Sequence, residues 1–128
     1  MTSPRLVDPW FEARFYGRCS PDGGTTEYLD SIDGAQGLFL WCPCGYGKPE
    51  FPLENGRPHG VMVPFANPRD APPLPANHGP TSRDDPTRHP RWTMNGTGLS
   101  DLTCSPSIAV GKPECWHGYI TDGIVRSC

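Results

Sequence analysis

Apolar residues occur along the chain in short runs, and glycine, proline and polar residues bound each run. The clearest run, residues 37–42, places four apolar side chains ahead of a cysteine and predicts a buried strand. Residues 60–65 predict a second strand, and Pro64 confines its end to a sheet edge because proline donates no ladder hydrogen bond. Two later segments, 91–96 and 102–110, predict further strands, the second interrupted by a proline.

The strongest hairpin signal lies near the end of the sequence. Residues 116–121 and 124–126 are joined by the pair Asp122-Gly123. Asp-Gly is favoured in two-residue turns in which both residues adopt positive φ. We therefore predict two antiparallel strands with a tight turn at this pair.

The first forty residues are less decisive. Asp8 can cap a helix whose first residue is Pro9. Residues 11–16 alternate in polarity as a strand does, and we expect the strand. Residues 25–33 predict another short strand.

Composition supports a β-rich chain with long loops. Of 128 residues, 15 are glycine and 17 proline, and only 35% are hydrophobic, so long helices and helical bundles are excluded. We expect a mostly β fold with little helix, in which five to seven short strands form a small zinc-stapled sheet or open barrel with long Pro/Gly-rich loops. Residues 1–36 are predicted to pack on a zinc-binding β core formed by 37–66 and 91–128. Residues 67–90 are proline-rich and predict an extended loop or arm.

The cysteines could supply a cross-link that stabilises this chain, which has few apolar residues. The six are Cys19, Cys42, Cys44, Cys104, Cys115 and Cys128. An even number in a small chain is compatible with three disulfides in an oxidising compartment. The first residues contain no apolar segment of signal-peptide length, and one residue alone separates Cys42 from Cys44, so a bond between those two would be strained. These observations favour a metal over disulfides.

Two ligand pairs stand out, each with one intervening residue: Cys42-Pro43-Cys44 and Cys115-Trp116-His117. Zinc takes four ligands in a tetrahedron from cysteine sulfur and histidine nitrogen, and two close pairs on separate turns can supply them. The usual short zinc pair has two intervening residues, so the spacing is a weaker signal than a Cys-x-x-Cys pair. On the residues alone, His117 could equally be a surface histidine, and Cys19 and Cys104 ordinary core residues.

Several of these motifs together carry a resemblance. Residues 42–47, which contain the Cys42-Pro43-Cys44 pair, follow an apolar strand, and residues 92–96 (Trp-Thr-Met-Asn-Gly) come later. The segment 102–108 (Leu-Thr-Cys-Ser-Pro-Ser-Ile) then precedes the Cys-x-His motif at 115–117 and the sequence Asp-Gly-Ile-Val at 122–125. This order resembles a family of small uncharacterised proteins common in phage and prophage genomes, some of which are labelled ammonia monooxygenase. The resemblance covers residues 37–47 and 91–126.

The resemblance implies that Cys42, Cys44, Cys115 and His117 are the ligands of one structural zinc ion. It implies no activity and no catalytic residue. Cys104 departs from the family pattern, because a residue other than cysteine is expected before Ser-Pro-Ser, and it adds a fifth candidate ligand. Four protein ligands would close the coordination shell and leave no place for a substrate.

From this we predict a non-enzymatic, zinc-stabilised protein-interaction module. In the phage setting it would be a virion component, such as a capsid or tail accessory protein, or a small host-directed factor. Its partners would be proteins, virion proteins among them, bound through residues 67–90, and a homo-oligomer is compatible with this. We expect it in the virion or the cytoplasm of an infected bacterial cell, not secreted through a signal peptide and not in a membrane, since no run of about 18 apolar residues exists.

Two other classes of function stay open. A zinc-dependent hydrolase or deaminase needs an open coordination position and a general base, and only Glu114 adjoins the ligands in sequence. The deaminase signature His-x-Glu is absent. A net charge of −3 argues against nucleic acid as a partner. A zinc-knuckle nucleic-acid binder could still stack bases on its aromatic residues Trp41, Tyr46, Trp92 and Trp116.

Overall fold

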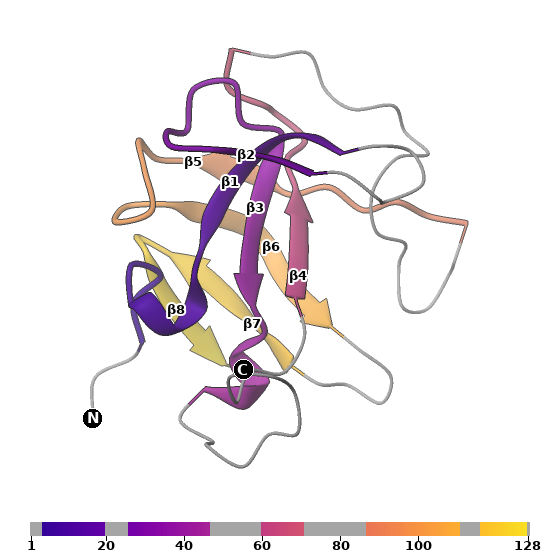
Figure 1. Ribbon diagram of the computed structural model, residues 1–128. Helices are drawn as coiled ribbons and strands as arrows, with labels where there is room; N and C mark the ends of the chain where they lie inside the picture. The colour runs from indigo at the N-terminus through magenta and orange to yellow at the C-terminus, as the bar shows by residue number, and fades with distance from the viewer. Residues whose placement is uncertain (1–3, 20–25, 47–59, 71–86, 111–115, 128) are drawn as a thin grey trace.

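The chain folds into two four-stranded antiparallel sheets (Figure 1). The computed structural model describes residues 4–19, 26–46, 60–70, 87–110 and 116–127. Within these ranges there is no α-helix, and the two short helical turns, η1 (Pro9–Phe11) and η2 (Pro43–Gly45), are of the 3-10 type. No helix in this part of the chain has the length and apolar character needed to cross a membrane. The prediction of a mostly β fold is confirmed.

The strands follow each other along the chain with few crossovers. The first sheet has the order β2-β1-β3-β4 and contains β1 (Arg14–Cys19), β2 (Thr26–Leu29), β3 (Gly37–Trp41) and β4 (Gly60–Pro64). The second sheet has the order β5-β6-β7-β8 and contains β5 (Thr93–Asn95), β6 (Thr103–Val110), β7 (Trp116–Thr121) and β8 (Ile124–Ser127). The described residues thus hold eight strands, where five to seven were expected, and neither sheet closes into a barrel.

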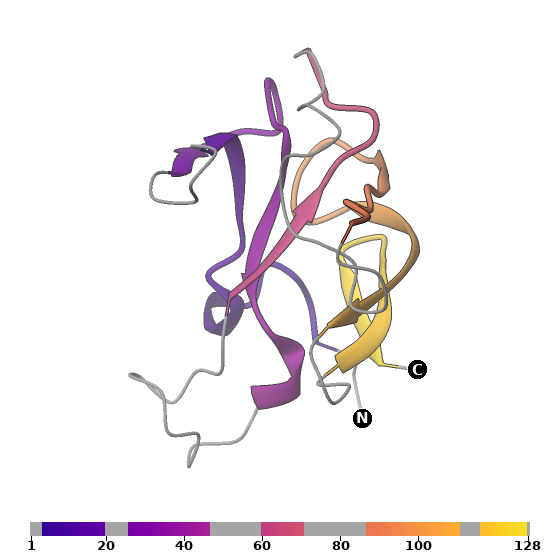
Figure 2. The ribbon, with the colours of Figure 1, turned by 90° about the vertical axis from the view of Figure 1, so that its right-hand side faces the viewer.

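The core lies between the two sheets. Figure 2 shows them as separate layers, with the indigo-to-magenta strands of the first sheet beside the orange-to-yellow strands of the second. Their inner faces contribute to one buried apolar cluster, which includes Phe15, Leu38, Leu40, Ile108, Ile120 and Val125. Removing this surface from water is the main force that holds the layers together.

The expected hairpin is confirmed at the predicted turn. Thr121 pairs with Ile124, so Asp122 and Gly123 alone form the connection, with φ of 50° and 74°. Gly123 is also packed tightly, since a Cβ placed on it would lie 2.4 Å from the carbonyl oxygen of Ser100. Its amide donates to the carbonyl of Leu102 at 2.8 Å, which ties the turn to the entry of β6.

Other local predictions are confirmed as well. β3 is buried at its first four positions, and β4, which ends in Pro64, lies at a sheet edge. Near the start of the chain both alternatives occur in succession. Asp8 caps η1 by accepting a hydrogen bond from the amide of Trp10 at 3.0 Å, and β1 begins at Arg14.

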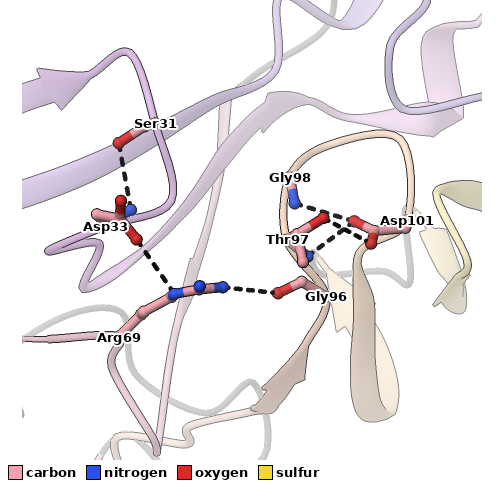
Figure 3. Close-up of polar contacts among 7 residues, drawn as sticks. All are labelled: Ser31, Asp33, Arg69, Gly96, Thr97, Gly98 and Asp101. Atoms are coloured by element: carbon pink, nitrogen blue, oxygen red, sulfur yellow. Dashed lines mark hydrogen bonds and ion pairs between the residues drawn. The ribbon is translucent and has the colours of Figure 1, made fainter.

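Arg69 connects loops at the same end of both layers (Figure 3). Its Nε lies 3.1 Å from Oδ1 of Asp33, in the β2–β3 connection, and its Nη1 donates to the carbonyl of Gly96 at 3.2 Å. The loop after Gly96 is closed by Asp101, whose carboxylate accepts from the amide and hydroxyl of Thr97 at 2.9 and 2.8 Å. Of the expected arm at 67–90, the structure describes residues 67–70 and 87–90, and residues 71–86 fall outside the described residues.

Candidate active site

β6 carries a bulge in the middle of the second sheet. Cys104 pairs with Ile120, but the next pair along β7 is Ile108 with Gly118, so residues 105–107 of β6 face Tyr119 alone. A bulge of this kind bends the strand and redirects side chains, and bulges are frequent beside active sites. Cys104 and Ile108 both stay in the core, and the residues between them turn toward solvent.

The bulge brings a serine and a histidine together on the outer face of this sheet. Ser107 precedes the core residue Ile108, and His117 alternates with the buried Trp116 and Gly118, so both point away from the core. The Oγ of Ser107 lies 3.0 Å from Nε2 of His117. Both side chains are half-buried, which leaves them accessible from solvent.

Neighbouring contacts fix the two strands that carry this pair. The carbonyl oxygen of Ser107 accepts a hydrogen bond from the indole Nε1 of Trp92 at 3.2 Å. Beside His117, a Cβ on Gly118 would lie 2.0 Å from the carbonyl oxygen of Arg126, so only glycine allows β7 and β8 to approach this closely. Trp116 donates from its indole to Oγ of Ser127 at 3.0 Å. The pair is therefore held by the central strands of the sheet.

A serine hydroxyl at this distance from an imidazole has the arrangement of a nucleophile and a general base. The 3.0 Å separation falls within the range of about 2.6–3.2 Å that such a pair requires. When Nδ1 of His117 carries the ring proton, Nε2 accepts the hydrogen bond of the Ser107 hydroxyl. The arrangement can transfer the hydroxyl proton to the imidazole as the oxygen attacks an electrophile.

The cysteine turn lies at the end of the second sheet where β7 begins (Figures 1 and 2). Cys42 is buried and Cys44 is half-buried. A shallow pocket is lined by Pro43 of this turn together with residues of β8. Because Ser127 of β8 pairs with Gly118 of β7, the turn lies close to the strand that carries His117.

Aromatic residues hold this turn against the N-terminal segment. The ring of Tyr46 stacks on Phe11 with centroids 5.1 Å apart and meets Trp10 edge to face at 5.3 Å. Its hydroxyl donates to the carboxylate of Asp8. That hydrogen bond lowers the pKa of Asp8 and raises the pKa of Tyr46, because the ionised carboxylate is its favoured acceptor.

The predicted metal ligands are only partly described. Cys42 and Cys44 lie on η2 and its cap, His117 lies on β7, and Cys115 falls outside the described residues. Among the residues whose positions are given, no three histidine, cysteine or acidic side chains gather as a metal site. The four-ligand zinc site stays a prediction. Since Nε2 of His117 meets Ser107, a metal would have to bind this ring through Nδ1.

The other candidate cysteines differ in their surroundings. Cys104 lies in the core on β6, and burial raises the pKa of its thiol to about 12. Among the described residues, Cys104 does not gather with two other potential metal ligands. Cys19 ends β1, and Cys128 falls outside the part of the chain described by the structure.

The comparisons with known proteins point to one enzyme family. The family model of the bacterial ubiquitination-like system serine protease (BubE) matches residues 76–128, less than half of the chain. The matched segment contains all of the second sheet and both residues of the Ser107–His117 pair. No curated protein and no solved structure matches the chain.

This match corrects the prediction that the protein is not an enzyme, since the matching family is named for a serine protease. That prediction rested on four protein ligands, His117 among them, closing a zinc shell and leaving no place for a substrate. The resemblance to phage proteins, the interaction-module function, the partners and the location are tested by none of these findings and stay predictions.

Sequence reasoning missed Ser107. The segment Ser-Pro-Ser-Ile was singled out as a motif without a role for its hydroxyls. A usable signal was present, because the strand containing Ser107 and the strand containing His117 are consecutive and joined by a short connection, and such strands usually pair. The bulge that aims the two side chains at each other is not visible in the pattern of residues.

Proposed function

We propose that the protein is a serine hydrolase that cleaves peptide bonds, with Ser107 as the nucleophile and His117 as the general base. The observation that carries the proposal is the 3.0 Å contact between Oγ and Nε2 on an accessible face of the second sheet. The family match over residues 76–128 supports it, because the printed name of that family is a serine protease and the match includes both residues.

The chemistry follows the two-step course of acyl transfer. The Oγ of Ser107 attacks the carbonyl carbon of the scissile peptide bond, and its proton passes to Nε2 of His117. The C–N bond then breaks, and the imidazolium gives this proton to the departing amine. A water molecule, deprotonated by His117, attacks the resulting serine ester. The new carboxylic acid leaves, and the serine hydroxyl recovers its proton from the imidazolium.

We also retain zinc as a proposal, in a structural role. Cys42 and Cys44 lie on one turn, and this turn lies near the start of β7, the strand that follows Cys115 in sequence. With these three cysteines a bound zinc ion would supply a cross-link between distant segments of a weakly apolar chain. Whether His117 completes this site as the fourth ligand depends on whether its ring binds the metal or acts as the general base for Ser107.

The two roles of His117 exclude each other. A metal on Nδ1 leaves the proton on Nε2, which then donates to Ser107 and cannot accept its proton. A general base needs the opposite tautomer. We favour the base, because the family matched over residues 76–128 is named for a serine protease, whereas the Nε2 contact alone is compatible with both tautomers.

Labelling with a fluorophosphonate tests the hydrolase. The reagent reacts with activated serines, so we expect one covalent adduct on Ser107, located by peptide mass spectrometry. Ser107→Ala should lose the adduct, whereas Ser105→Ala, which changes an exposed serine in the same bulge, should keep it. An unlabelled wild-type protein that is correctly folded would refute the proposal.

His117→Asn separates the two roles of the ring. If His117 is the base, the variant loses labelling by about 10²–10⁴-fold and keeps its bound zinc, as measured by elemental analysis. If it is a ligand, zinc content falls instead. Loss of zinc from His117→Asn with labelling retained would exclude the dyad.

A further inference from the structure

Next to Ser107, one edge of β6 is only partly covered by β5. β5 pairs with β6 only at Thr103, Cys104 and Ser105. Beyond Ser105, β6 continues to Val110. In the part of the chain described by the structure, no strand pairs with this continuation on the side of β5.

The hairpin at β7–β8 settles which backbone groups of β6 point toward this side of the strand. Thr121 and Ile124 flank a two-residue turn, a geometry in which they exchange both of their backbone hydrogen bonds. Hydrogen-bonded pairs alternate along an antiparallel ladder, so Tyr119 also bonds toward β8. The backbone groups of Gly118 and Trp116 must then point the other way, toward β6.

The same alternation applies to β6. Ile108 pairs with Gly118 and therefore bonds toward β7, whereas Ala109, which pairs with His117, directs its N–H and C=O away from β7. The hydrogen bond from the indole of Trp92 to the carbonyl of Ser107 agrees with this, because Ser107 is two residues before Ala109 and uses the same side. Ala109 is exposed.

We propose that this edge binds the substrate: an extended polypeptide segment pairs with the N–H and C=O of Ala109 as an added strand and presents a peptide bond to Ser107. This inference rests on the proposed hydrolase function and deepens it by naming the substrate class, unfolded or extended polypeptide. Main-chain hydrogen bonds to a sheet edge are a general mode of peptide recognition. A strand added here would run about 4.8 Å from β6 at Ala109, two residues along the chain from Ser107, whose carbonyl accepts from Trp92.

Recognition of this kind depends little on side chains. The two groups of Ala109 bind the backbone, which every polypeptide has in common. We therefore expect wild-type protein to cleave unfolded, fluorescein-labelled casein, and to cleave natively folded proteins more slowly, because their backbone groups are already paired.

Ala109→Pro tests the proposal by removing one amide. Proline is tolerated where the N–H of a strand faces away from its neighbour, so the variant should fold. We expect casein cleavage to fall about tenfold or more, the effect of one lost hydrogen bond in a binding site. Labelling of Ser107 by the small fluorophosphonate should fall much less than casein cleavage, since this reagent needs the dyad but no main-chain pairing at the edge. Ala109→Ser changes the side chain but keeps the amide, so its casein cleavage should exceed that of Ala109→Pro.

The outcomes distinguish the two proposals. Wild-type protein that is labelled at Ser107 but does not cleave unfolded casein, or Ala109→Pro that cleaves it at the wild-type rate, overturns strand addition and leaves the hydrolase standing. Absence of labelling refutes the hydrolase itself.

If Ala109→Pro does not fold, hydrogen exchange gives the answer. In Ser107→Ala, which binds without turnover, the Ala109 amide should exchange fast alone and about tenfold slower with saturating unfolded casein. Equal rates would overturn the proposal.

Discussion

Gly123 combines two constraints that a single substitution can separate. The residue has φ of 74°, and its α-carbon lies against the backbone of the loop that precedes β6. An alanine Cβ at this position would lie 2.4 Å from the carbonyl oxygen of Ser100 and 2.8 Å from that of Leu99. Gly123→Ala should therefore destabilise the protein through both backbone strain and overlap.

The magnitude follows from these two contributions. A residue with a Cβ at positive φ costs about 1–2 kcal/mol relative to glycine. Overlap with backbone atoms that must move adds about 1–3 kcal/mol, the range found for overpacked sites. We expect a total loss of about 2–5 kcal/mol in the free energy of unfolding, a large fraction of the stability of a small domain.

Gly34 provides a matched control. It has a φ of 79°, but no atom lies within 4 Å of a Cβ built there. Gly34→Ala should cost only the conformational part, about 1–2 kcal/mol. The lower entropy that alanine gives the unfolded chain is common to both variants and cancels in their difference.

Urea unfolding followed by tryptophan fluorescence measures both variants. We expect Gly123→Ala to lose at least about 1 kcal/mol more than Gly34→Ala, at an unchanged dependence on urea concentration. The turn also anchors β7, so labelling of Ser107 should slow in Gly123→Ala and stay unchanged in Gly34→Ala. Equal destabilisation by the two substitutions would show that the contact with Ser100 does not constrain the turn.

Two further predictions concern ionisable groups. Hydrogen bonds from Thr97 hold the pKa of Asp101 below its usual 3.8. The carboxylate therefore stabilises the fold above pH 3.8 and loses this effect as the pH falls through the lowered pKa. Asp101→Asn should lower the melting temperature at neutral pH, and the difference from wild type should vanish in strong acid. Burial raises the pKa of the Cys104 thiol to about 12. Iodoacetamide at mildly alkaline pH should therefore modify Cys104 only after denaturation, as peptide mapping would show. Modification of the native protein at the rate of the unfolded chain would contradict the burial of this thiol.

Several elements were predictable because their causes are local. The Asp122-Gly123 turn needs two residues at positive φ, and only the chemistry of those two residues decides it. The apolar run of β3 and the proline that ends β4 likewise indicate burial and an edge position without knowledge of the partners. The pattern around Asp8 contained both a helical cap and a strand, and the chain uses them one after the other.

The candidate site was not predictable in the same way. The sequence marks an interruption of β6 at Pro106, but the side to which Ser107 then points depends on the register with β7. His117 was noticed only as a member of a Cys-x-His pair. The 3.0 Å contact between them is a diagonal contact between two strands, and a shift of one residue in register would place the side chains on opposite faces.

The connectivity of the second sheet has a consequence for how the protein reaches its native state. β5, β6, β7 and β8 are neighbours in space in the same order as in the chain, and two residues alone join the last pair. Contacts between such near neighbours close short loops and lose little chain entropy. In the first sheet, by contrast, β3 meets β4 only after the long segment between Trp41 and Gly60 has closed. The residues proposed to carry the chemistry thus belong to the most local part of the topology, which we expect to order early in folding, before the first sheet is complete.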